Sequence, residues 1–118
     1  MHVFRLKPST IPGAGVGVFA TAAIPAGTPL PELFAADDVR FVPWAEFAAL
    51  PEPAEVTENF AVRYDDGAYL PRDVNRISVG WFLNDSRDPN LAHDPEYLYS
   101  ALRDIAAGEE LLIDYDRL

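Results

Sequence analysis

Proline and glycine recur along the whole chain, and their spacing constrains the fold more than any other feature. The 118 residues include eleven prolines and seven glycines, so few segments can continue as long helices without meeting a residue that bends or ends them. Apolar residues make up 49% of the chain, which is enough to pack the core of one domain. We therefore predict a single domain, residues 1–118, that is mostly β with one or two short helices.

Local patterns predict where the strands and helices lie. Apolar spacing in residues 43–50 favours a two-turn helix with Pro43 at its first position, and residues 51–56 are predicted as a loop. Strands are expected in short apolar runs that end at turn residues: two within 16–33 joined at Pro25-Ala26-Gly27, a hairpin of 60–64 and 68–70 around Asp-Asp-Gly, and two at 98–105 and 110–115.

One pattern occurs twice. Ala, then Ile four residues on, Ala-Gly at six and seven and Leu at ten are shared by ATAAIPAGTPL (Ala20–Leu30) and ALRDIAAGEEL (Ala101–Leu111). Each copy is expected to be a strand with a buried Ile, a Gly corner at positive φ and a Leu that returns to the core. The alternative is chance similarity in an alanine-rich chain.

The charge of the chain bounds its partners. Nineteen acidic residues against nine basic ones give a net charge of -10, so direct binding to nucleic acid is not expected. A Lys/Arg-rich peptide would be attracted, although acidity also serves solubility alone. The absence of cysteine and of a long apolar N-terminal run predicts a soluble cytoplasmic protein without a membrane segment.

Several common kinds of site are not indicated. GAGVGVF (Gly13–Phe19) is not a dinucleotide fingerprint, because we expect no strand before it and no helix after it, and no Lys-Ser/Thr closes it as in a phosphate loop. His2 and His93 lie far apart and the Asp-rich segments do not have calcium-loop spacing, so no metal site is predicted. Ser86 lacks the surroundings of a nucleophile.

Three further segments occur together in one known family. They are GVGVFATAAIPAGTPL, FLNDSRDPN and ALRDIAAGEELLIDY, in that order along the chain. The first resembles the opening of a SET domain, the second that family's F-x-N-H-S-x-x-P-N motif, and the third its A-x-R-D-I-x-x-G-E-E-L-x-x-D-Y ending. The chain thus resembles a compact SET-domain protein-lysine methyltransferase.

The resemblance implies a fold and a cofactor. The fold is a β-clip of small curled sheets whose C-terminal segment forms a pseudoknot, and the methyl donor is S-adenosyl-L-methionine. By this resemblance Gly15, Val16 and Gly17 would line the methionine part through their backbone. Asn84 would hold the charged end of the cofactor through its amide, and the backbone at Asp85 would meet the adenine.

The resemblance also implies the reaction and its substrate. A neutral lysine amine of a basic protein segment would take the methyl group, and an apolar channel would help the amine, with its pKa of about 10.4, to lose its proton. Tyr115 would be the catalytic residue that orients the amine. Phe82, Ile113 and Tyr97 would line the channel.

The sequence departs from the family pattern at several places. Asp85 stands where the family has His, and Ile113 where it has Phe or Tyr. Residues 33–42 lack the usual Tyr-x-Gly-Glu signal. Only three residues follow Tyr115, where the family has a lid, so we expect the variable insert, roughly residues 31–68, or a second subunit of a homodimer to close the channel.

Two alternatives remain open from the sequence. One is a SET-fold binding module with weak or no catalysis, which the departures at Asp85 and at the lid would suit. The other is a SAF-like β-clip domain with a structural or ligand-binding role, which the paired Ile-x-Ala-Gly corners also resemble. Binding of S-adenosylmethionine separates the second from SET proteins, and turnover on basic peptides separates the first from an enzyme.

Overall fold

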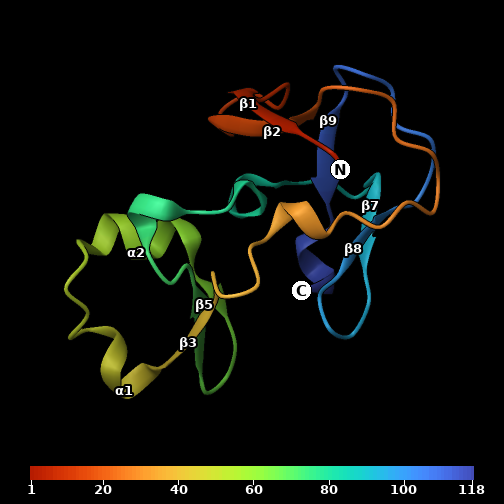
Figure 1. Ribbon diagram of the computed structural model, residues 1–118. Helices are drawn as coiled ribbons and strands as arrows, with labels where there is room; N and C mark the ends of the chain where they lie inside the picture. Colours follow the sequence, from red (N-terminus) through yellow and green to blue (C-terminus); the bar gives the residue numbers. More distant parts are fainter.

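Short strands and two short helices form two lobes joined by extended segments (Figure 1). The computed structural model describes all residues, 1–118. The strands are β1 (Phe4–Pro8), β2 (Val16–Ala20), β3 (Arg40–Pro43), β4 (Val62–Arg63), β5 (Gly67–Leu70), β6 (Asn84–Asp85), β7 (Leu91–His93), β8 (Tyr99–Ala101) and β9 (Glu110–Ile113). The helices are α1 (Trp44–Phe47) and α2 (Ala54–Phe60), with 3₁₀ turns η1 (Pro31–Leu33), η2 (Val74–Arg76), η3 (Val79–Phe82) and η4 (Tyr115–Arg117). The predicted mostly-β class is confirmed, and none of the helices has the length and apolar character needed to cross a membrane.

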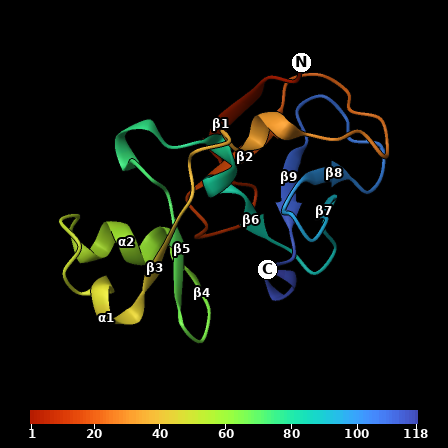
Figure 2. The same ribbon diagram turned by 60° about the horizontal axis from the view of Figure 1, so that its bottom comes forward.

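The first lobe is built on a four-stranded sheet in the order β1-β2-β9-β6. β1, β2 and β9 are antiparallel neighbours, whereas β6 pairs with β9 in parallel, with Asn84 opposite Leu112 and Asp85 opposite Ile113 (Figure 2). The C-terminal strand β9 therefore lies inside the sheet, between β2 and β6. This is how the C-terminal segment is fastened beside the Asn-Asp segment, as expected for the pseudoknot of the predicted fold.

The two repeated segments pair with each other. Ile24 and Ile105 exchange two backbone hydrogen bonds, both of 2.8 Å. Both isoleucines are buried in the core of the first lobe. The prediction of two similar hooks is confirmed. The second strand expected within residues 16–33 is reduced to single bridges at Ile24 and Pro29, which pair with the other repeat and with β8 rather than with β2.

The corners of the two hooks are equivalent as well. The Gly27 N–H donates to the Ala101 carbonyl, and the Gly108 N–H donates to the Ala20 carbonyl, each at 2.8 Å. Gly27 has a φ of 81° and Gly108 a φ of 84°, a conformation that is strained for residues with a Cβ. The two repeated segments thus form equivalent turns, and the glycine of each turn donates a hydrogen bond to the first residue of the other segment.

The core of the first lobe collects buried side chains from β2, the two hooks, β7, β8 and β9. Its apolar residues come from both ends of the chain, so the C-terminal third supplies an essential part of this core. The members of this cluster are Val18, Ala20, Ile24, Leu30, Leu33, Leu83, Leu91, Tyr99, Ala101, Ile105, Leu111 and Ile113.

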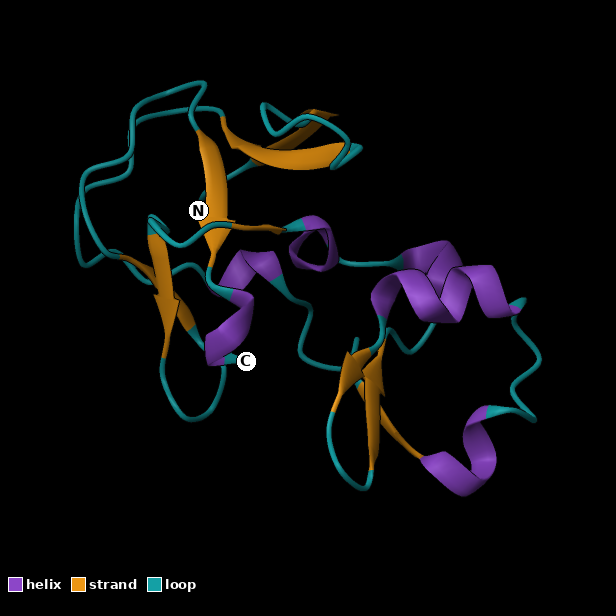
Figure 3. Ribbon diagram, turned by 180° about the vertical axis from the view of Figure 1, so that it is seen from behind, coloured by secondary structure: helices purple, strands orange, loops and turns teal.

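The second lobe holds a three-stranded sheet in the order β3-β5-β4, with α1 and α2 on one side of it (Figure 3). Val42, Ala68 and Leu70 are buried and alternate with exposed residues, as expected for a sheet with one covered face. The Asp-Asp-Gly hairpin predicted from the sequence is confirmed, since β4 pairs with β5 across it. Arg40 forms an ion pair with Glu52, which precedes α2.

Three local predictions are corrected. Residues 51–56 were expected as a loop, but α2 begins at Ala54, because Pro53 at the N-cap pre-sets the backbone and Ala54 and Glu55, which both favour helices, follow it. Pro43 likewise precedes α1 rather than occupying its first turn, and α1 has four residues. A strand, β1, does precede the Gly-rich segment, which continues into β2 and not into a helix.

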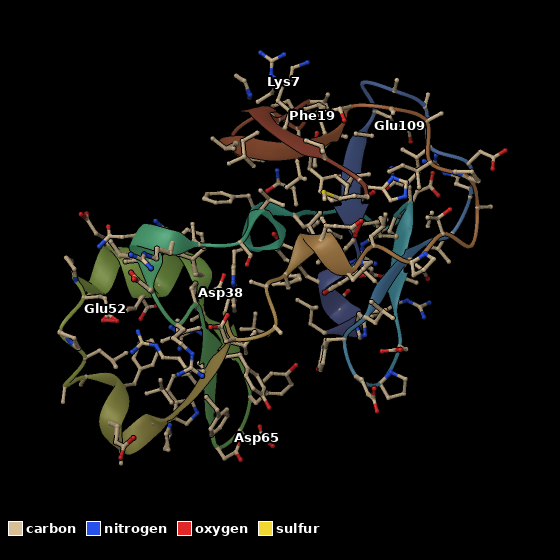
Figure 4. All side chains as sticks on the ribbon, in the orientation of Figure 1. Lys7, Phe19, Asp38, Glu52, Asp65 and Glu109 are labelled. Atoms are coloured by element: carbon tan, nitrogen blue, oxygen red, sulfur yellow. The ribbon has the colours of Figure 1, made fainter.

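Asp38 fastens the connection between the lobes (Figure 4). Its carboxylate accepts backbone N–H bonds from Ser78 at 2.6 Å and Arg72 at 3.2 Å. Its carbonyl accepts from the indole N–H of Trp81 at 3.3 Å. Although Asp38 is buried, its oxygens are satisfied, which removes most of the cost of burying it. The segment before the second lobe is thereby tied to the segment that returns to the first.

Candidate functional site

Asn84 contacts the Gly-rich segment directly. Its Nδ2 donates to the Val16 carbonyl at 3.0 Å and to Glu110 Oε2 at 3.1 Å. An amide nitrogen has two hydrogens, so both donors of Asn84 are committed within the protein. The carbonyl oxygen Oδ1 is left as the group that can serve a ligand. The structure thus brings together four of the residues predicted from the sequence: Gly15, Val16, Gly17 and Asn84.

Glu110 orients this amide, and the sequence analysis gave it no role. It is 5% exposed and accepts hydrogen bonds from the Ser9 hydroxyl at 2.8 Å, from the Thr10 hydroxyl at 2.6 Å and from the Thr10 N–H at 2.9 Å. Burial alone would raise the pKa of Glu110, but the bonds from Thr10, Asn84 and Ser9 outweigh it and lower the pKa. The one feature of the sequence that could have identified Glu110 was its place in the Gly-Glu-Glu-Leu motif.

Gly17 is required by the position of Glu110. A Cβ added at Gly17 would lie 2.3 Å from Glu110 Oε2 and 3.3 Å from Asn84 Nδ2. Because both side chains are held by hydrogen bonds, neither can move away cheaply. The missing side chain lets the backbone of β2 pack against the polar pair that orients the Asn84 oxygen.

Asn90 supports β9, the strand that carries Glu110. It is fully buried, and its Oδ1 accepts from the Leu112 N–H at 2.8 Å. Its Nδ2 donates to the Glu110 carbonyl at 2.8 Å and to Glu109 Oε2 at 3.0 Å. Glu109 also pairs with Arg103 at 2.7 Å. Burial would raise the pKa of Glu109, but the bonds from Arg103, Ala106 and Asn90 lower it.

Asp85 joins the Asn84 segment to Tyr115. Its Oδ1 accepts the backbone N–H of Tyr115 at 2.8 Å. In addition, the backbone N–H of Ser86 donates to the Ile113 carbonyl at 2.8 Å. A carboxylate at this position therefore has a structural use, which is to fix the start of the turn that carries Tyr115.

The Tyr115 hydroxyl points back at the same segment. It donates to the Leu83 carbonyl at 2.6 Å, one residue before Asn84. Burial and, to a smaller extent, the charge of Asp85 raise the pKa of Tyr115, so the phenol stays neutral at physiological pH. Since its one hydrogen is directed to Leu83, the oxygen lone pairs are free to accept a hydrogen bond from a ligand.

The three predicted channel residues do not form one cluster. Ile113 is buried and lines a cavity of about 200 Å³ together with Tyr99 and His93. Phe82 packs edge-on against Phe60 of α2, with ring centroids 5.5 Å apart. Tyr97 stacks on the outer side of His93 at 4.7 Å and lines a different cavity.

Tyr99 was missed as a wall of the Ile113 cavity. It is 4% exposed, and burial raises its pKa to about 12. Its ring stacks on Phe34 of the inter-lobe segment at 5.8 Å and meets His93 edge-on at 5.4 Å. In the sequence it is one tyrosine of a Tyr-Leu-Tyr run, and which tyrosine points inward is decided by the register of β7 and β8.

The chain that carries this fold and this polar network matches a known protein family. The family model for the SET domain matches residues 15–116, which covers most of the chain. The chain therefore belongs to the SET-domain family. The match separates it from the SAF-type domains that its paired corners also resemble.

Solved structures agree in fold at low sequence identity. The chain is similar to part of a humanized mutant of the Chaetomium thermophilum Polycomb Repressive Complex 2 bound to the inhibitor GSK126, with a TM-score of 0.68 and 22% identity over 98% of this chain, although it spans only 15% of that one. It is also similar to a Plasmodium falciparum protein provisionally named as a histone methyltransferase, with a TM-score of 0.61 and 16% identity, covering 98% of this chain and 94% of that one. No curated protein sequence matches the chain significantly.

Proposed function

We propose that the chain is an S-adenosylmethionine-dependent protein-lysine methyltransferase. The observation that carries the proposal is the pair of bonds that commits both N–H groups of Asn84, to Val16 and to Glu110. They leave an uncommitted amide oxygen beside a glycine-rich backbone segment. SET-family membership supports the same reading.

The residues present fit the proposed cofactor. The charged end of S-adenosylmethionine carries an ammonium, and an uncommitted amide oxygen is a suitable acceptor for it. At Gly15 an added Cβ would meet no atom within 4 Å, so a ligand can approach the backbone closely beside Asn84. Bound there, S-adenosylmethionine supplies a methyl group already activated on a sulfonium.

The role of the protein is then to position the amine. A lysine must lose a proton before it can attack, and its pKa of about 10.4 in water opposes this. The Tyr115 oxygen, with its own hydrogen directed to Leu83, can accept a hydrogen bond from the neutral amine and aim its lone pair. Fixing the orientation of two reactants is among the largest contributions a protein can make to such a displacement.

The proposed substrate is a Lys/Arg-rich protein segment. The net charge of -10 would steer a basic chain toward the protein, and this effect is screened by salt over about 8–10 Å near physiological ionic strength. Association rates should therefore fall as salt rises. A preferred neutral or acidic peptide would contradict this part of the proposal.

Calorimetry with S-adenosylmethionine tests the proposal. The wild type should bind it, and Asn84→Ala should weaken binding about ten- to a hundredfold, because a hydrogen bond to a charged group is lost. Asn59→Ala, at an exposed position of α2, is the matched control and should bind as the wild type does. Unchanged affinity in a folded Asn84→Ala protein would remove Asn84 from the site.

A further inference from the structure

The small sheet of the second lobe has an uncovered aromatic face. Phe41 of β3 and Tyr69 of β5 are paired neighbours, 39% and 37% exposed, and they lie on the face opposite to Val42, Ala68 and Leu70. Because α1 and α2 cover the other side, this aromatic face is directed to the first lobe (Figure 3). Large exposed rings gathered on one face of a monomer commonly mark a binding surface.

The aromatic rings on this face meet at steep angles and so form adjoining walls. Tyr69 meets Phe41 edge-on at 5.2 Å and 65°, and it meets Tyr64 edge-on at 5.6 Å and 89°. From the first lobe, the Tyr97 hydroxyl lies 2.7 Å from the Tyr64 hydroxyl and closes another side. These four rings and Asp66 line an open cavity of about 320 Å³, which we call the aromatic box.

Tyr64 and Tyr97 form a fixed wall of the box. Burial, followed by the hydrogen bond to Tyr97, raises the pKa of Tyr64 to about 12. Tyr97 itself is held at a φ of 62°, and it is the only residue other than glycine with positive φ. The Tyr64–Tyr97 contact joins the two lobes, so the box exists only in the assembled fold.

The charge around the box is negative. Asp66 is the charged residue that lines the cavity, and Asp65 precedes it in the same turn (Figure 4). The nearest cation along the strand, Arg63, is committed elsewhere: it lies over Trp44 at 5.1 Å and pairs with Glu58. Ring faces together with a carboxylate attract organic cations.

We propose that the aromatic box binds a methylated lysine side chain. A methylated ammonium is larger and less hydrated than a bare ammonium, so its methyl groups can lie against several ring faces while Asp66 complements the charge. Binding needs neither S-adenosylmethionine nor methyl transfer. It therefore stands or falls separately from the proposed activity.

The box adjoins the cavity beside Ile113 but is distinct from it. His93 lines that cavity and Tyr97 lines the box, and their rings stack at 4.7 Å to form the wall between them. A peptide bound in the box would thus reach the first lobe beside the predicted channel. The box would select peptides that already carry a methyl mark.

The direct test is titration of the protein, without cofactor, with a short peptide whose only charge is that of one trimethyllysine. The comparison is the same peptide with carbon in place of the quaternary nitrogen, which has the same shape and no charge. Chemical shifts of the tyrosine rings report binding. We expect saturable binding of the cation and at least tenfold weaker binding of the neutral isostere.

Variants locate the site. Asp66→Asn and Tyr97→Asn should each weaken binding several-fold, and asparagine suits the positive φ at residue 97. Asp65→Asn is the matched control and should change binding less than Asp66→Asn. A circular dichroism spectrum identical to that of the wild type shows that each variant is folded.

Four outcomes overturn the proposal. Absence of binding does so directly, and equal binding of the neutral isostere would indicate an apolar groove instead. Tighter binding of the matching arginine peptide would assign the box to a guanidinium. Equal effects of Asp65→Asn and Asp66→Asn would reduce the interaction to the overall charge of the protein.

Discussion

The Tyr115 hydroxyl donates to the backbone carbonyl of Leu83 at 2.6 Å, while the Tyr115 N–H donates to the side chain of Asp85 at 2.8 Å. One residue near the end of the chain is thus held at both its backbone and its ring by the segment on either side of Asn84. The position of the proposed catalytic oxygen is set by these two bonds.

The first prediction concerns the titration of Tyr115. Its pKa is raised above the ordinary value of 10, first by burial and then by Asp85. Asp85→Asn keeps an oxygen to accept the Tyr115 N–H but removes the charge. The pKa should therefore fall in this variant and stay above 10, as measured by tyrosinate absorbance with Tyr115→Phe subtracted.

The same titration has a consequence for stability. A raised pKa means that the fold favours the neutral phenol, so this contribution is complete below pH 10 and is lost as the pH rises through the folded-state pKa. A Tyr115 signal at or below the ordinary value in the wild type would contradict the burial of its hydroxyl.

The second prediction concerns Glu110. Its pKa is lowered from the ordinary value of 4.5, so below that pH the unfolded chain binds more protons than the folded one, and stability falls as the pH falls. Glu110→Gln should lose roughly 1.5–3 kcal/mol at neutral pH. The deficit should shrink in acid, as measured by urea unfolding.

Glu55→Gln, at an exposed position in the first turn of α2, is the control for Glu110→Gln and should leave the stability nearly unchanged at both pH values. A Glu110→Gln deficit that is the same at neutral and acidic pH would mean that the carboxylate charge is not what Ser9, Thr10 and Asn84 recognise.

Much of the first lobe could be predicted from the sequence because its signals are local. The repeated Ile-x-Ala-Gly pattern encodes two corners, and these corners fix the pairing of Ile24 with Ile105. Helix α2 was missed because prolines at 51 and 53 suggested a loop, although a proline before a helix is compatible with its start. β1 was missed although Phe4 to Lys7 alternate apolar and charged residues, a pattern typical of a strand, because the run is only five residues long and ends at Pro8.

The third prediction tests this repeat. Gly27→Ala and Gly108→Ala meet no neighbouring atom within 4 Å, so only the left-handed backbone opposes the added Cβ. Each should lower the free energy of unfolding by about 1–2 kcal/mol, and the two losses should be similar. Thermal unfolding of both variants checks this, and a large difference between them would contradict the equivalence of the corners.

The site was predicted in part. Gly15, Gly17, Asn84, Asp85 and Tyr115 come together because the motifs encode them. The hydrogen bond between Ser9 and Glu110 could not be predicted, since it joins residues 101 positions apart. The aromatic box was also invisible, because it depends on strand register and on how the lobes face each other.

The fourth prediction concerns Ile113, which stands where the family has Phe or Tyr and lines the cavity beside Tyr99. With a smaller side chain there, products beyond monomethyl-lysine are expected. Ile113→Tyr should shift the products toward fewer methyl groups, at a cost of about 1–3 kcal/mol from overpacking. Leu112→Tyr, on the other face of β9, is the control in mass spectrometry of the peptide products. Strict monomethylation by the wild type would contradict the assignment.

The most direct test of the central claim is the transfer of a radiolabelled methyl group from S-adenosylmethionine to lysine in a mixture of basic proteins, by the wild type and by Tyr115→Phe. The wild type should label lysine, and Tyr115→Phe should lose most of the rate while keeping its affinity for the cofactor, because the lost contact acts mainly in the transition state. Cofactor binding without labelling would make the chain a binding module. A folded wild type that neither binds S-adenosylmethionine nor labels lysine would contradict the account.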